Sequence, residues 1–284
     1  MKPGRGSDAA PVAAAATAHE PGAVGLFGPG SVTWRVLGEP VMWMGGLRAM
    51  YLQALHPRVM RATWQNTAFA REGEAWGRFA RTVEFVRVRT YGTAEQVERA
   101  GRRVRTVHAT LTGTDADGSV IRLDEPELLL WVHCGEIASY ADVARRCGMG
   151  ITATQLDEFV NEQRRSAAVV GLDPAQVPAS MAELATYYER MQPELGACKE
   201  ARQAFVRSFM PDIPWPLTGL KLVVPPANVL GFATLPRWAR RMYGAPGSPV
   251  TDMTATIALR AIYQATTRVP PQLLGMAGPE IAAA

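Results

Sequence analysis

Cysteine and lysine are both scarce in this chain of 284 residues. Its three cysteines, Cys134, Cys147 and Cys198, are an odd number at wide spacing, and no C-x-x-C pair occurs. Neither a disulfide framework nor a zinc site follows from them, so a reducing, cytoplasmic setting is expected. Lysine occurs only three times, so arginine carries nearly all of the positive charge. Its forked guanidinium favours bidentate contacts to carboxylates or phosphates.

A basic stripe and a long apolar run are also missing. Basic and acidic residues alternate through most of the chain, so we expect no nucleic-acid partner. No apolar run is long enough for a transmembrane helix. The stretch LTGLKLVVPPANVLGF, residues 217–232, is interrupted by Pro225 and Pro226. It is typical of a buried or membrane-touching element, which leaves a peripheral membrane contact open.

Several catalytic motifs are absent as well. The sequence has no G-x-S-x-G nucleophile elbow, no P-loop, no H-E-x-x-H and no E-x-x-H. These absences argue against an α/β-hydrolase, a P-loop nucleotide hydrolase, a zinc metalloprotease and a carboxylate di-iron bundle. The glycines of GMGITA follow a predicted helix rather than a strand, so they do not indicate a dinucleotide site.

The chain divides into a tail and one or two helical units. Residues 1–24 lack the apolar core and the twin arginine of a signal peptide, and we expect them to form a disordered tail. Residues 25–210 are predicted to form a compact helical core domain. Residues 211–284 are predicted to form a smaller helical extension that packs on it.

Helical signals dominate the part of the chain that follows the tail. Ser31 is expected to begin a helix that stops at Pro40, and residues 41–65 are predicted to form a buried helix kinked at His56 by Pro57. Three capping boxes predict further helix starts: Thr93 with Gln96, Thr152 with Gln155, and Ser180 with Glu183.

Strand signals are nearly absent. Asp117-Gly118 predicts a single hairpin turn, and we find no internal repeat. Asp115 and Asp117 resemble part of a calcium loop, but the six spaced ligands of an EF-hand are missing. The predicted fold class is therefore all-α.

Three histidines, His56, His108 and His133, lie in apolar helices. A histidine in such a place is usually a core residue that bonds a backbone carbonyl or a carboxylate. His108 differs because Arg105 lies three residues before it, on the same helix face. A cation beside a histidine keeps its ring neutral, which is the form that ligates a metal.

The preceding predicted helix carries a second arginine group. In RFART, Arg78 and Thr82 are four residues apart, with Arg81 beside Thr82. Arginines and a hydroxyl beside apolar residues suit a pocket for a flat apolar ligand with anionic ends. The alternative, a solvated basic face that pairs with nearby glutamates, stays open; the glutamates concerned are Glu74, Glu84 and Glu98.

A b-type haem fits this combination of residues. It needs one neutral histidine on the iron, an apolar slot for the ring and basic residues near the propionates. Covalent c-type attachment is excluded because no C-x-x-C-H occurs.

Five stretches together resemble a known family: LFGPGSVTWRVLGEP, GGLRAMYLQALHPRVM, RTVEFVRVRTYGT, VRTVHATLTGTDADG and DEPELLLWVHCGEIASY. The family is DUF2236, also called the MpaB/rubber oxygenase catalytic domain family, which includes the latex clearing proteins. The resemblance runs from about residue 26 to at least residue 210. It implies an all-α fold with a globin-like core and a b-type haem.

The resemblance assigns expected roles to the histidines. His108 matches the iron ligand of an R-x-x-H helix, and Arg105 matches the arginine of that motif. His133 resembles a histidine near the haem periphery. His56 belongs to the pattern of the smaller bacterial members, in which a place on the distal side and a core role at the kink are equally open.

The resemblance also implies a pocket on the neighbouring helix. Arg78, Arg81 and Thr82 match an arginine-then-lysine-threonine cluster, with Arg81 in place of the lysine. Glu72 and Glu74 are the nearest candidates for a general base. The substitution at Arg81 and the uncertain match of the glutamates put rubber cleavage itself in doubt, but not haem binding.

The expected function is a haem b-dependent oxygenase that uses O2 to cleave or oxygenate a carbon–carbon double bond in a lipophilic, isoprenoid-type substrate. Two alternatives remain. The first is a helical module that binds a lipid or another apolar ligand without redox chemistry. The second is a haem-binding protein without oxygenase turnover.

Overall fold

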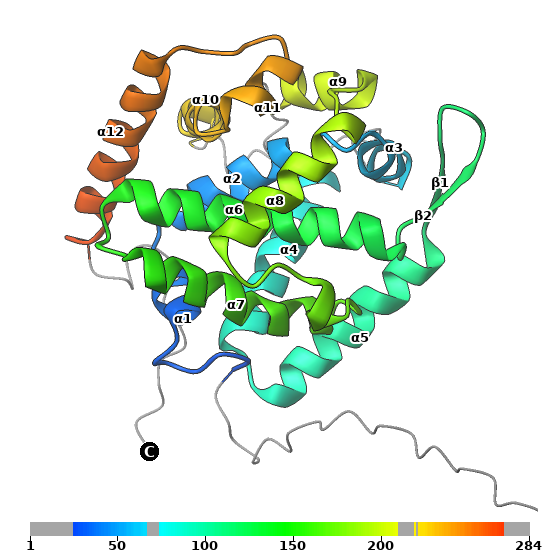
Figure 1. The fold of residues 1–284 in the computed structure, drawn as a ribbon, viewed down its shortest axis with the longest axis horizontal. Helices are drawn as coiled ribbons and strands as arrows, with labels where there is room; N and C mark the ends of the chain where they lie inside the picture. Colours follow the sequence, from blue (N-terminus) through cyan, green and yellow to red (C-terminus); the bar gives the residue numbers. More distant parts are fainter. Residues whose placement is uncertain (1–24, 67–73, 210–218, 220, 270–284) are drawn as a thin grey trace, which may run out of the picture.

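The structure is a computed structural model that describes residues 25–66, 74–209, 219 and 221–269. These residues form twelve α-helices and one antiparallel pair of short strands, which confirms the all-α class (Figure 1). The globin-like core stays a prediction, and the predicted tail, residues 1–24, lies outside the described residues.

The elements follow one another along the chain in this order: α1 (Val32–Leu37), α2 (Met42–Gln53), α3 (Pro57–Asn66), α4 (Glu74–Tyr91), α5 (Ala94–Thr110), β1 (Thr112–Thr114), β2 (Val120–Arg122), α6 (Pro126–Cys147), α7 (Ala153–Val169), α8 (Met181–Met191), α9 (Lys199–Ser208), α10 (Val224–Ala233), α11 (Arg237–Met242) and α12 (Pro249–Thr266).

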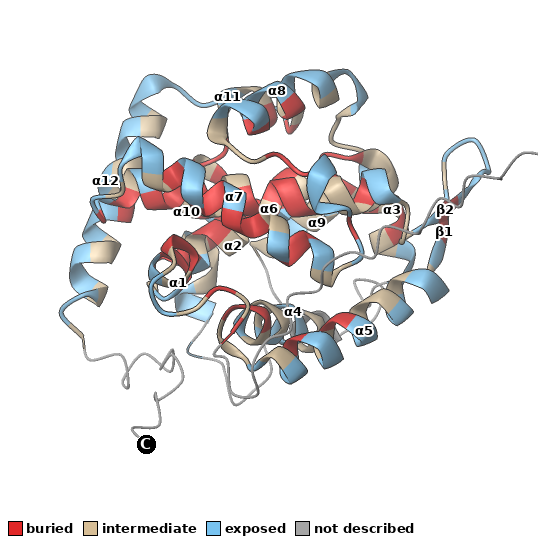
Figure 2. Ribbon diagram, turned by 60° about the horizontal axis from the view of Figure 1, so that its bottom comes forward, coloured by how far each residue is buried: buried red, intermediate tan, exposed pale blue. Residues whose placement is uncertain are grey.

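Helix α6 runs through the centre of the molecule and packs on α2, α7, α8 and α12 (Figure 1). Buried residues are concentrated along α6 and α2 (Figure 2). The main hydrophobic cluster contains Trp131 and Ile137 of α6 together with Phe232 of α10 and Leu259 of α12. The C-terminal helices therefore share one core with the rest of the described chain.

Helices α2 and α6 approach each other closely because glycines lie at their contact. A Cβ atom on Gly45 would lie 2.6 Å from Cδ1 of Tyr140, and one on Gly135 would lie 2.8 Å from Cγ of Gln53. The indole N–H of Trp131 donates to the carbonyl of Gln53 at 2.8 Å. Glycine at both positions thus fixes the spacing at which this hydrogen bond forms.

This contact predicts opposite effects at two adjacent glycines. Gly45→Ala is expected to lower the free energy of unfolding by about 1–3 kcal/mol, because the added methyl overpacks against Tyr140. Gly46→Ala is the matched control, since its Cβ would lie 3.9 Å from Oη of Tyr140. It is expected to stabilise the helix by about 0.5–1 kcal/mol. Urea unfolding measures both; equal effects of the two substitutions would contradict the close packing.

The prediction of a single kinked helix over residues 41–65 is wrong in one respect. The chain breaks between Gln53 and Pro57 and forms two helices, α2 and α3. Pro57 takes the first position of α3, where its missing N–H costs nothing. The Nδ1 atom of His56 accepts a hydrogen bond from the backbone N–H of Val59 at 3.5 Å. His56 thus helps to begin a new helix rather than to stabilise a bend.

The predicted helix starts are largely confirmed. Complete capping boxes form at Thr93 and at Thr152. Ser180 also accepts from the backbone N–H of Glu183 at 3.1 Å, but the carboxylate of Glu183 accepts from Ala179 instead of closing the box.

The predicted hairpin is confirmed, with Gly113 opposite Ile121 in its register. Gly118 has a φ of +85°, which glycine adopts without strain. Asp115 pairs with Arg58 at 3.3 Å and with Arg61, so its charge is compensated by guanidinium groups. The two arginines therefore explain the position of the Asp115 carboxylate without a calcium ion.

Two further expectations concern cysteines and membranes. All three cysteines are free, and Cys134 and Cys147 are buried. In the part of the chain that the structure describes, none of the helices combines the length and the apolar character that a bilayer crossing requires.

Candidate functional site

His108 lies in the last turn of α5, where it is half-buried. Its Nδ1 atom is buried and has no hydrogen-bond partner. Burial is the main cause that lowers the pKa of His108, and the positive charge of Arg78 lowers it further, while Asp124 acts in the opposite direction. The imidazole is therefore neutral at pH 7, with one ring nitrogen that no protein group occupies.

Arg105 does not supply the charge beside His108. Its guanidinium donates to the carbonyl of Val169 in α7 at 2.7 Å and pairs with Glu98 at 3.1 Å. These contacts hold α5 against α7. The expectation that Arg105 keeps His108 neutral is thus corrected: the cation that acts on this ring is Arg78, from the neighbouring helix α4.

The three predicted residues of α4 are not equivalent. Arg78 is half-buried, and burial and the charge of Arg81 lower its pKa. Arg81 and Thr82 are exposed, and the hydroxyl of Thr82 donates to the carbonyl of Arg78 at 3.1 Å, within its own helix. The structure therefore brings Arg78 near His108 but leaves Arg81 and Thr82 at the surface.

The glutamates considered as partners or bases have different positions. Glu84 pairs with Arg87 at 2.7 Å, and Glu98 pairs with Arg102 at 3.2 Å as well as with Arg105. Glu72 and the side chain of Glu74 lie outside the described residues.

His133 belongs to a second, closed polar cluster between α4, α6 and α7. Only 5% of the residue is exposed, and its Nε2 atom is buried without a partner. Burial lowers the pKa of His133 to about 4; Arg89 lowers it further, whereas Glu136 and a hydrogen bond with the backbone of Gln163 raise it. His133 is therefore a neutral imidazole enclosed by protein.

Arg89 and Glu136 form the ion pair of this cluster. The Nη1 atom of Arg89 donates to Glu136 at 3.2 Å, Nη2 donates to the other carboxylate oxygen, and Nε is buried without a partner. The side chains are 4% and 18% exposed. Sequence reasoning missed both residues, although one signal was present: Glu136 is the only acidic residue between Glu127 and Asp142 in α6.

Local contacts explain the position of His56 in the fold. Besides its bond at the start of α3, its ring centroid lies 6.0 Å from that of Trp131. Burial is the main cause that lowers its pKa, and Glu194 acts in the opposite direction. Among the described residues, no group of three or more His, Cys, Asp or Glu side chains is placed to hold a metal ion.

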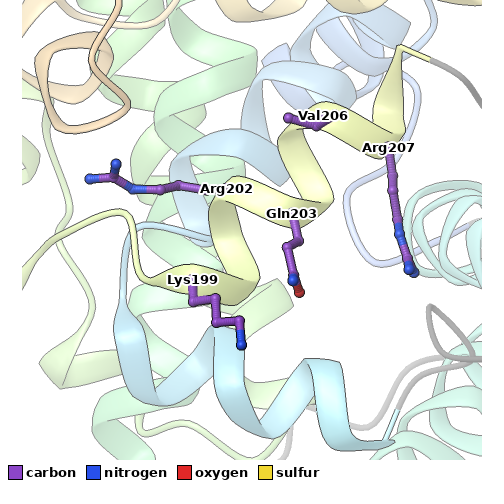
Figure 3. Close-up of a pocket in the computed structure, with 5 residues that line it drawn as sticks. All are labelled: Lys199, Arg202, Gln203, Val206 and Arg207. Carbon is purple, nitrogen blue, oxygen red and sulfur yellow. The ribbon is translucent and has the colours of Figure 1, made fainter.

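A pocket of about 630 Å³ lies elsewhere, on α9 (Figure 3). Its described lining residues are Lys199, Arg202, Gln203, Val206 and Arg207. Figure 3 shows that these side chains point in different directions rather than toward one point. None of the predicted site residues lines it, so the pocket does not identify the site.

Comparison with known protein families matches residues 34–268 to the family described as ER-bound oxygenase mpaB/B'/Rubber oxygenase, catalytic domain. The chain belongs to this family. The match confirms the resemblance, and it extends beyond residue 210 through α10, α11 and all of α12. The mpaB/rubber oxygenase assignment supports an oxygenase, hence an oxidoreductase, at the level of the family. No curated protein and no solved structure matches the chain.

Proposed function

We propose that the protein is a haem b-dependent oxygenase that acts with O2 on a carbon–carbon double bond of a lipophilic, isoprenoid-type substrate. The observation that supports it most is His108, a neutral imidazole with a buried, unpartnered nitrogen, in a chain of an oxygenase family. Haem b, when bound, supplies a redox-active iron for the chemistry of O2.

The described residues fit a haem in two respects. One histidine is enough as a protein ligand, because the porphyrin itself supplies four nitrogens. His108 would be that ligand. Arg78 adds a positive charge next to it, which suits a propionate or another anionic group. Arg105 would position the ligand, since its bond to Val169 holds the helix that carries His108.

His108 is a better candidate ligand than His133, although both have an unpartnered nitrogen. His108 is half-buried in the last turn of α5, so its ring is less enclosed than that of His133, although its Nδ1 atom is itself buried. His133 is 5% exposed and lies beside the Arg89–Glu136 pair. A role for His133 at the haem periphery stays a prediction, as do the roles of Arg81, Thr82 and His56. The three free cysteines support a reducing, cytoplasmic setting.

The test is an absorption spectrum of the purified protein before and after addition of haem. We expect a Soret band that shifts or disappears in His108→Ala, with haem affinity reduced by about tenfold or more. Val107→Ala, at an exposed neighbouring position of α5, is the control and should bind haem like the unsubstituted chain.

Three results would contradict the proposal. The absence of a Soret band both before and after haem addition would show that the protein binds no haem. A band that is unchanged in His108→Ala but lost in His133→Ala would move the ligand to α6. A bound lipid without haem, detected by native mass spectrometry, would favour the non-redox binding module. Oxygen consumption with isoprenoid substrates then separates turnover from haem binding alone.

A further inference from the structure

Helix α10 and the residues before it present an uncharged, apolar face to solvent. Leu222 is 83% exposed, Val223 is 59% exposed and Val229 is 56% exposed. Residues 222–236 contain no charged side chain. Leu222 and Val223 lie in the turn directly before α10, and Val229 lies on the helix itself. Apolar side chains gathered and exposed in this way mark an interaction surface.

Helix α12 continues this apolar face. Val250, Met253 and Ile257 are 62%, 58% and 59% exposed, and their spacing of three and four places them on one side. Figure 2 shows exposed residues along the outer side of α12. A hollow of about 330 Å³ is lined by Val229 of α10 and by Thr251, the neighbour of Val250 in α12, so the two helices border the same hollow. We call these six exposed apolar residues the α10–α12 surface.

The same part of the chain carries the positive charge of the protein. Residues 199–257, from the start of α9 to Ile257 of α12, contain seven basic and three acidic residues, a net charge of +4 that equals the formal charge of the whole chain. Asp252 pairs with Arg237 and with Arg240. Arg202, Lys221 and Arg241 are exposed, and Lys221 directly precedes Leu222. Figure 1 shows α9, α10, α11 and the start of α12 along one edge of the molecule. Exposed basic side chains therefore lie on the same edge of the molecule as the apolar surface, and Lys221 is directly next to it in the chain.

We propose that the α10–α12 surface docks onto an anionic lipid membrane. Such a membrane offers an apolar interior to the exposed side chains and negative headgroups to the surrounding basic residues. Helix α10 has ten residues and is about 15 Å long, roughly half the apolar thickness of a bilayer, so it lies in the interface. The docking does not depend on the cofactor or on oxygenase activity.

Charge complementarity favours a membrane over the other occupants of such a surface. A second copy of the chain would bring the same excess of positive charge against itself, which opposes association. A nucleic acid would match the basic border but would leave the apolar centre without a partner. Only an anionic lipid surface matches both parts.

The experiment is co-sedimentation of the full chain with lipid vesicles of phosphatidylcholine, with or without about 30% phosphatidylglycerol. We expect binding to the anionic vesicles that is about tenfold stronger than to the neutral ones. L222S/V229S should weaken it by about tenfold or more, because two buried apolar contacts are lost. V120S is the matched control, since Val120 is 67% exposed on β2, away from this surface.

A second pair of variants tests the charge. K221E/R241E should also weaken binding by about tenfold, while R103E, at an exposed position of α5, should leave it unchanged. Circular dichroism checks that each variant folds. If L222S/V229S does not fold, vesicle binding by K221E/R241E still tests the proposal.

Equal binding to neutral and anionic vesicles, or equal behaviour of the surface variants and their controls, would overturn the proposal. Sedimentation velocity tests whether a second copy of the chain occupies the surface instead. A dimer that L222S/V229S dissolves, found without vesicle binding, would assign the surface to a second copy instead and would equally overturn it.

Discussion

Glu136→Ala is expected to lower the free energy of unfolding by about 3–5 kcal/mol. The substitution leaves the guanidinium of Arg89 charged and 4% exposed, with its Nε already lacking a partner. A buried charge without a counter-ion is far costlier than the pair it came from. Urea unfolding followed by circular dichroism measures the loss.

Two comparisons make this result specific to the buried pair. Glu84→Ala breaks the Glu84–Arg87 pair, in which both side chains are 56% exposed, and should cost about 1 kcal/mol or less. The double substitution R89L/E136L should recover most of the stability, because it removes both charges together. If Glu136→Ala costs no more than Glu84→Ala, the pair is not enclosed in solution.

Acid is expected to destabilise the protein through His133. The unfolded chain binds a proton at this residue below about pH 6.5, whereas burial lowers the folded pKa to about 4. Falling pH between these values therefore favours unfolding, by about 2 kcal/mol at pH 5 and about 3 kcal/mol below pH 4. Above about pH 7 the ring is neutral in both states, and the residue contributes no pH dependence.

The measurement is the pH dependence of urea unfolding in the unsubstituted chain and in His133→Gln. Carboxylates titrate in both proteins, so the difference between the two slopes isolates the histidine. The variant should lose the share of acid sensitivity that His133 contributes, whatever its stability at pH 7. Parallel curves from pH 7 to pH 4 would show that the ring is accessible to protons in the folded protein.

Local features of the fold were predictable from the sequence. The capping boxes at Thr93 and Thr152 and the Asp117-Gly118 turn are confirmed because each depends on residues a few positions apart. Pro57 correctly indicated a helix boundary. Whether the helix bends or ends there depends on whether the residues just before Pro57 stay helical. That choice depends on the ring of His56 and its bond to Val59.

The candidate site was predictable only in part. The spacing of Arg105 and His108 placed them on one side of α5, yet Arg105 bonds Val169 of another helix. The charge beside His108 comes from Arg78, thirty positions earlier. Helical spacing cannot decide which of two arginines faces a histidine, because that depends on how α4, α5 and α7 pack. The pairing of Arg89 with residue 136 was missed for the same reason.

The packing of α2 against α10, far along the chain, has a consequence for how the chain folds. Small helical proteins usually fold rapidly because most of their contacts join near neighbours. Here Arg48 bonds Thr234 across 186 residues, and Tyr51 accepts through its carbonyl from Tyr243 across 192 residues. Large loops must close before these contacts form, and the loss of chain entropy on closure slows that step. During synthesis, α6 can cover one side of α2 early, but the side of α2 that faces α10 stays uncovered until α10 and α11 have left the ribosome, so the core is completed late.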